Sequence, residues 1–170
     1  MYTMQPGVQA YTAVYMDISV MRDLRSDVLV CSSFYYETPF YTPTEFSEEE
    51  IADYLHAGYD MIKEARYKIL VAHCPPYQTA IDRLHAGSHV GSYSVRTFIE
   101  TYQPDLCISG HIHEAPGEDA IGQTLLLNPG MLAQGGYVTV TCTPEMLTAQ
   151  RMPGHDTRHY STSPFMPSSL

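Results

Sequence analysis

Residues 68–76 read KILVAHCPP, a short continuous apolar run that ends abruptly in a histidine, a cysteine and two prolines. A second stretch, DLCISGHIH at residues 105–113, repeats this arrangement, because an apolar run again leads directly into histidines. Apolar runs of this length are typical of strands buried on both faces, as in parallel sheets. The two stretches therefore predict strands of an α/β layered domain with His73, His111 and His113 at their carboxyl ends.

The rest of the chain alternates between strand and helix signals. Ser47 followed by Glu50 fits a capping box, and the adjacent glutamates suit the positive end of a helix dipole. Ser92 can cap a second helix that ends before Pro104. Further strands are predicted at residues 14–20, 27–31 and 124–127, and a closing hairpin at 137–142 and 146–150.

Length and composition indicate one acidic globular domain. The 170 residues carry 9 Lys+Arg against 19 Asp+Glu, a net charge of -10, and 44% of them are hydrophobic. Such a surface repels phosphate backbones, so generic nucleic-acid binding is not expected. We expect the domain to cover residues 1–150, and residues 151–170, which are rich in Pro and Ser, to form a flexible tail.

Targeting signals are not apparent in the sequence. The first residues have no cationic start with an apolar core, and no apolar run approaches the ~20 residues of a membrane span. The four cysteines form no CxxC pair and lie in apolar contexts typical of buried free thiols. These features predict a soluble, cytoplasmic protein that is not bound to a membrane.

The histidines indicate metal chemistry. In an extended segment residues i and i+2 point to the same side, so His111 and His113 would face one cavity. Open α/β sheets bind ligands at the carboxyl ends of their strands, where His73 is also expected. Two ions of a hydrolytic pair lie roughly 3.5–4 Å apart, so the imidazoles of His111 and His113 could each coordinate one ion.

The ordered motifs resemble those of calcineurin-like metallophosphoesterases. They are VAHCPP (71–76), Asp82, GSHVGS (87–92), CISGHIHEAPG (107–117) and LLLNPG (125–130), and the resemblance covers residues 27–142. It implies an α/β/β/α sandwich that lacks part of its N-terminal half in this chain. It also implies two divalent ions (Mn, Fe or Zn), with His73 and His111 as ligands of one ion and His113 as a ligand of the other.

Other residues have weaker expected roles. In the family resembled here, the position of His89 lies near the mouth of the pocket, which implies a contact with substrate. Asp82 is expected on a helix after the H-x-P-P segment, where it could cap or pair locally. Asn128 is expected to fix the backbone beneath the site, because Asn-Pro-Gly is a turn sequence.

Three motifs of the family are not found before residue 73: D-x-H, G-D and G-N-H. Asp17 matches only the aspartate of D-x-H, because Ser19 stands at the position of the histidine ligand. No catalytic residue is therefore assigned, because the G-N-H histidine protonates the leaving group in that family. The missing ligands could lie upstream, come from another chain, or have been lost together with catalysis.

The expected function is that of a metal-dependent phosphoesterase, which hydrolyses a small phosphomonoester or phosphodiester through metal-activated water. The alternative is a catalytically inactive member of the same fold that serves as a binding or scaffold subunit. A sandwich without part of its N-terminal half would leave an unpaired sheet edge, which predicts a homo-oligomer.

Overall fold

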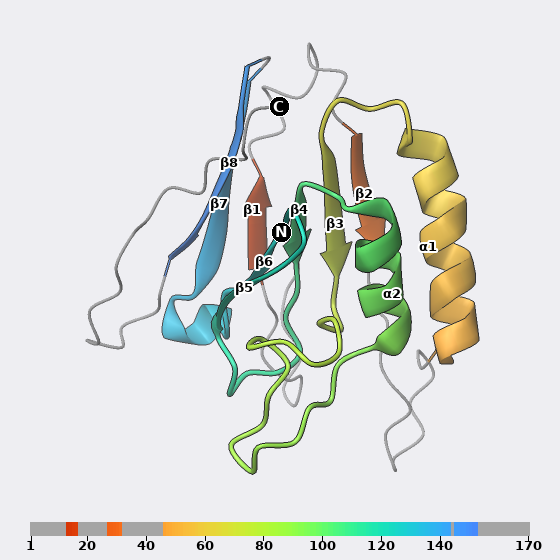
Figure 1. The fold of residues 1–170 in the computed structure, drawn as a ribbon. Helices are drawn as coiled ribbons and strands as arrows, with labels where there is room; N and C mark the ends of the chain where they lie inside the picture. Colours follow the sequence, from red (N-terminus) through yellow and green to blue (C-terminus); the bar gives the residue numbers. More distant parts are fainter. Residues whose placement is uncertain (1–12, 17–26, 32–45, 144, 153–170) are drawn as a thin grey trace, which may run out of the picture.

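Two sheets lie face to face, and two helices cover the outer side of the larger sheet (Figure 1). The computed structural model describes residues 13–16, 27–31, 46–143 and 145–152. Its described part thus has a helix layer, a five-stranded sheet and a three-stranded sheet. Asp17, residues 32–45 and residues 153–170 lie outside the described residues.

The five-stranded sheet positions the candidate site. Its order is β2 (Asp27–Cys31), β3 (Lys68–Ala72), β4 (Leu106–Ile108), β6 (Thr124–Asn128) and β5 (Gly117–Ile121). The first four strands are parallel, and β5 is antiparallel to β6. Consequently β3 and β4 are direct neighbours, and the residues that follow them emerge at the same edge.

The smaller sheet consists of β1 (Ala13–Met16), β7 (Tyr137–Cys142) and β8 (Leu147–Met152). β7 and β8 form the antiparallel hairpin predicted around residues 143 and 144, while β1 runs parallel to β7. Between the two sheets lies an apolar layer that includes Ile69, Leu127 and Val138. The alternation of inward and outward side chains in β7 agrees with this packing on one face.

Helices α1 (Glu48–Ile62) and α2 (Tyr93–Tyr102) pack on the opposite face of the larger sheet (Figure 1). The predicted capping box is present, because Ser47 Oγ accepts from the Glu50 amide and the Glu50 carboxylate accepts from the Ser47 amide. Ser92 caps α2 by accepting from the Val95 amide. Both helices therefore begin at the predicted residues.

Glu48 has a role beyond the start of its own helix. Its carboxylate accepts hydrogen bonds from the Ser92 hydroxyl at 2.8 Å and from the Ser94 amide at 2.7 Å, at the N-terminus of α2. Burial alone would raise the pKa of Glu48, but the hydrogen bonds from Ser94, Ser92 and Tyr93 outweigh it and lower the pKa. One carboxylate thus joins the first turns of both helices.

Three local expectations differ from the structure. Strand β5 was not predicted, because its sequence GEDAI is polar and forms an edge of the sheet among the described strands. The last strand ends at Met152, two residues beyond the expected boundary at 150. Within residues 73–92, all of which the structure describes, no helix occurs between β3 and α2, so Asp82 lies in a loop instead.

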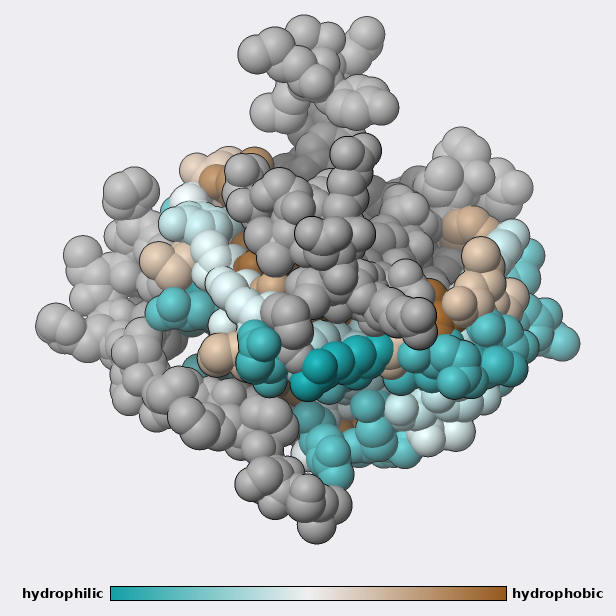
Figure 2. Space-filling model, turned by 90° about the horizontal axis from the view of Figure 1, so that it is seen from above, coloured by the Kyte–Doolittle hydropathy of each residue, from teal (hydrophilic) through white to brown (hydrophobic). Residues whose placement is uncertain are grey.

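The described surface is mostly hydrophilic in the view of Figure 2, and its apolar residues form small separate patches. Exposed large apolar side chains are correspondingly dispersed, for example Tyr54 in α1, Leu132 in the short 3₁₀ helix η1 (Leu132–Gln134) and Met146 before β8. None of the helices described here is long and apolar enough to cross a membrane.

Candidate metal centre

His73 and His111 meet at the carboxyl edge of the larger sheet. The Nε2 atom of His73 lies 3.1 Å from the Nδ1 atom of His111, and the ring centroids are 5.0 Å apart. His73 follows β3 directly, and His111 follows β4 after two residues. The prediction that the ends of these two strands bring histidines together is confirmed for this pair.

The backbone after β4 makes the approach possible. The Gly110 amide donates to the carbonyl of His73 at 3.0 Å, so the two loops are tied at the histidines themselves. His111 then adopts a left-handed conformation with φ of 59°. The Ile112 amide donates to the Gly110 carbonyl at 2.6 Å, which closes a tight turn.

The G-H-I-H segment forms this turn and not the extended backbone that the sequence analysis expected. The i, i+2 argument assumed an extended backbone, whereas His111 has positive φ and His113 lies in a turn. A left-handed residue rotates the following side chains away from the alternation of a strand. In the part of the chain that the structure describes, no group of three His, Cys, Asp or Glu side chains could hold a metal ion.

Burial keeps the two paired imidazoles neutral. Burial and, to a smaller extent, charge on His111 and His113 together lower the pKa of His73 to about 4. The pKa of His111 is also lowered, first by burial and then by His113. Neutral imidazole is the form that binds metal ions, so the pair is ready to act as a ligand at neutral pH.

The imidazole nitrogens of this site suit part of the coordination sphere of one divalent ion. Imidazole nitrogens suit Zn, Fe and related ions, and a site of this kind takes four or more ligands. His73 and His111 supply two convergent nitrogens, and His113 is close enough for its charge to affect both pKa values. The metal role of His73, His111 and His113 stays a prediction.

Asn128 supports this edge from below, as the sequence predicts. Its fully buried amide donates to the carbonyls of Ile112 at 2.9 Å and Ala115 at 3.0 Å, and its Oδ1 accepts from the Gly130 amide. A longer contact of 3.4 Å reaches the carbonyl of Ile81 in the other loop. One side chain at the end of β6 therefore holds the loops after β3 and β4 together.

Asp82 and His89 form a second pair. The sequence predicted that Asp82 could cap or pair locally, but it did not identify His89 as the partner. The carboxylate of Asp82 is fully buried, and its Oδ1 lies 2.6 Å from Nδ1 of His89. Seven residues separate the two in a loop without regular structure, so no periodicity signalled the contact. The tentative substrate role of His89 is not tested by this geometry.

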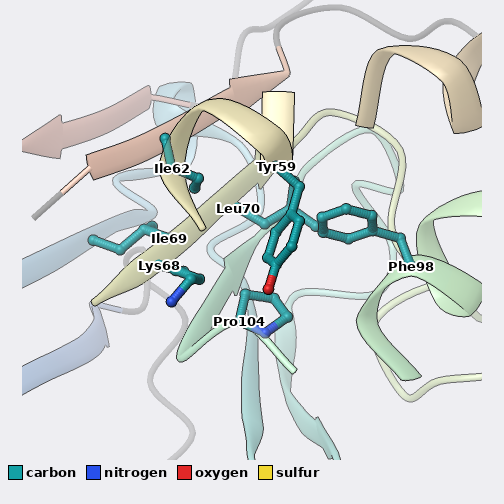
Figure 3. A pocket seen from close by; sticks show the side chains of 7 residues that line it. All are labelled: Tyr59, Ile62, Lys68, Ile69, Leu70, Phe98 and Pro104. Atoms are coloured by element: carbon teal, nitrogen blue, oxygen red, sulfur yellow. The ribbon is translucent and has the colours of Figure 1, made fainter. Parts of the chain in front are cut away.

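A shallow apolar pocket lies elsewhere and is separate from these groups (Figure 3). It is lined by residues at the start of β3, such as Lys68, and by Tyr59 and Phe98 of the two helices. The start of β3 is at the opposite end of the strand from His73, so this hollow is not part of the candidate metal centre.

Comparison with known proteins identifies the superfamily of the chain. A family model described as metallophosphoesterase, calcineurin superfamily, matches residues 49–152. This chain belongs to that superfamily. The match includes both histidine segments, Asn128 and the β7–β8 hairpin, and the observed helix layer and two sheets are those of the calcineurin-like fold.

Individual relatives are longer than this chain. An uncharacterized protein of Methanocaldococcus jannaschii is 42% identical over 97 residues, which are 55% of this chain and 43% of the relative. One crystal structure matches with a TM-score of 0.52 and 21% identity, over 73% of this chain and 44% of the other. The TT1561 protein of Thermus thermophilus matches with a TM-score of 0.46 and 20% identity, over 65% and 46%. The chain thus spans less than half the length of these relatives.

Proposed function

We propose that this protein is a metal-dependent phosphoesterase that hydrolyses a small phosphomonoester or phosphodiester. The observation that supports this most is the convergence of His73 and His111 at the ends of two adjacent parallel strands. The superfamily match supports a metal-binding role for these two converging histidines, because members of the superfamily bind divalent metals.

In this proposal His73 and His111 hold a divalent ion, and His113, which the structure does not group with them, joins as a further ligand when the ion binds. When bound, the ion would activate water and neutralise phosphate charge, which an acidic protein with net charge -10 otherwise repels. The chain's own contribution is to hold neutral imidazoles in place through Gly110 and Asn128. We propose manganese as the first ion to try, and a cytoplasmic location and a homo-oligomeric state as further expectations.

The test uses the full chain, stripped of metal with a chelator and reloaded separately with Mn²⁺ and Zn²⁺. Hydrolysis of p-nitrophenyl phosphate and bis(p-nitrophenyl) phosphate is measured for the wild type, His111→Ala and His85→Ala. His85 is the matched control, since its side chain is 85% exposed and it lies in the loop after β3.

We expect metal-dependent hydrolysis in the wild type and His85→Ala, and its loss in His111→Ala. Metal binding without hydrolysis of either ester would instead favour the alternative, an inactive binding or scaffold subunit. Equal rates in the wild type and His111→Ala would show that the activity does not come from this site.

A further inference from the structure

We infer that the stacked rings of Tyr77 and Tyr93 form a binding ledge for a planar ring of the substrate. The substrates are then nucleotide-like esters, in which a spacer joins the phosphate to an aromatic base. This inference rests on the proposed function and names the substrate class of that site. In such an ester the phosphate would lie at His73 and His111, and the base would lie on the ledge.

The two tyrosine rings stack against each other. Their centroids are 4.0 Å apart, and their planes make an angle of 32°. A side-chain hydrogen bond with Tyr77 raises the pKa of Tyr93, so the two hydroxyls also lie together. His89 supports the stack, since its ring contacts that of Tyr77 edge to face at a centroid distance of 6.1 Å. Tyr77 is therefore the inner ring of the ledge, and Tyr93 is the outer one.

The outer ring is open to a ligand. Tyr93 is 52% exposed, and in the part of the chain that the structure describes no ring other than that of Tyr77 contacts it. Aromatic rings prefer offset stacking on one another, and every nucleobase has a π face that can stack in this way. The ledge therefore suits a planar base better than an aliphatic group.

Hydrogen bonds hold the ledge in place. The Tyr77 amide donates to the Ser92 carbonyl at 3.0 Å, and the Tyr77 carbonyl accepts from Nη1 of Arg96 at 2.8 Å. The Tyr93 amide donates to the Glu48 carboxylate at 3.2 Å. A ring that is ordered before binding loses little conformational freedom when a ligand stacks on it, and this favours affinity.

The start of α2 does not itself bind the phosphate of the ester. Anions often bind at helix N-termini, but here the amides of Tyr93 and Ser94 donate to Glu48, and the amide of Val95 donates to Ser92. These donors are occupied, and the carboxylate of Glu48 repels a second anion. The ledge thus takes only the ring, and the phosphate is left to the paired histidines.

The ledge lies within reach of the paired histidines. Tyr77 follows His73 by four residues, so their Cα atoms are at most about 14 Å apart. Tyr93 is tied to the same loop, because the preceding residue, Ser92, donates its amide to the carbonyl of Pro75 at 2.8 Å. Helix α2 accordingly begins at the end of the larger sheet where β3 ends (Figure 1). The span from His73 to the ledge is of the order of the length of a nucleotide, so one ester can reach both.

Gly91 allows the start of α2 to lie against this loop. A Cβ atom at position 91 would lie 2.5 Å from the Pro75 carbonyl oxygen and 2.8 Å from the Pro76 carbonyl carbon. Any other residue would push Tyr93 away from the loop that carries Tyr77. The second glycine of the G-S-H-V-G-S segment therefore helps to build the ledge.

The experiment measures how adenosine 5′-monophosphate (AMP) and ribose 5-phosphate, which lacks the base, inhibit the full chain loaded with Mn²⁺. The reporter is whichever p-nitrophenyl ester the wild type hydrolyses. Tyr93→Ala removes the outer ring, and Tyr93→Phe keeps it. Tyr54→Ala is the matched control, because Tyr54 is 56% exposed and lies on α1.

We expect AMP to have an inhibition constant at least about fivefold lower than that of ribose 5-phosphate, as stacking of one base provides. This preference should hold in the wild type, Tyr93→Phe and Tyr54→Ala, and the two constants should become nearly equal in Tyr93→Ala. Equal constants in the wild type, or a preference that Tyr93→Ala retains, would overturn the inference and leave the proposed function intact.

A second measurement does not depend on hydrolysis. AMP and ribose 5-phosphate are titrated into the metal-free full chain while ¹H–¹⁵N correlation spectra are recorded. The amide signals of Tyr77 and Tyr93 should shift with AMP only, and the Tyr77 signal should not shift in Tyr93→Ala. These shifts in a wild type that hydrolyses neither p-nitrophenyl ester would support the ledge and overturn the proposed function. Their absence would overturn the ledge, whether or not the wild type is active.

Discussion

Nε2 of His73 and Nδ1 of His111 lie 3.1 Å apart, although 38 residues separate them along the chain. The contact exists because β3 and β4 are adjacent and parallel, so both histidines leave the sheet at one edge. A metal ion placed between them would use side chains that the fold has already ordered.

Replacing either histidine should weaken metal binding. Removal of a residue that only supports a ligand typically costs 10–100-fold in affinity, so His73→Ala and His111→Ala should each cost at least about 100-fold. Isothermal titration calorimetry with Mn²⁺ and Zn²⁺ measures the effect. His113→Ala is measured beside them, and an unchanged affinity in that variant would remove His113 from the ligand set.

Asn128→Asp should destabilise the protein. The substitution keeps the shape of the side chain but removes the donor that satisfies the carbonyls of Ile112 and Ala115 at a fully buried position. We expect a loss of about 2 kcal/mol or more in the free energy of unfolding, measured by urea denaturation. Gln134→Ala, on the exposed side of η1, is the control and should stay within about 0.5 kcal/mol of the wild type.

Glu48→Gln should lower stability at neutral pH, because a neutral amide interacts less well with the N-terminus of α2. We expect a loss of about 1–2 kcal/mol, and little effect of Glu49→Gln in the same turn.

The effect of Glu48 should also depend on pH. Its pKa in the folded state is below the ordinary value of 4.5, so its contribution is complete above that pH and is lost as the pH falls through the folded value. The stability difference between the wild type and Glu48→Gln should therefore shrink below about pH 4.5. A constant difference from pH 7 to pH 3 would contradict this explanation.

Cys74 should not react in the folded protein. Its thiol is fully buried, and burial together with the charges of Glu48 and Asp82 raises its pKa to about 12. The thiols of Cys107 and Cys142 are buried as well. Alkylation with iodoacetamide followed by peptide mapping should label none of the three at pH 8, and all of them after unfolding in guanidinium. Labelling of Cys74 in the native protein would indicate that the loop after β3 opens.

Local signals in the sequence were sufficient to predict most of the helices and strands. The apolar run at residues 68–72 coincides with β3, and the capping residues Ser47 and Ser92 mark the starts of both helices. Strand β5 gave no such signal, because only one face of an edge strand is buried and its glycine and two acidic residues lack β propensity. Its pairing with β6 decides its structure instead.

The sequence by itself determined most of the elements, the superfamily resemblance and the edge at which the histidines gather, because these follow from periodicity, caps and motif order within short windows. Only the tertiary structure decided how the side chains meet. The left-handed turn at His111, the pairing of Asp82 with His89 and the link from Glu48 to α2 depend on backbone conformation and on contacts between loops and helices. No periodic pattern encodes such contacts, since they form only when packing brings the segments together.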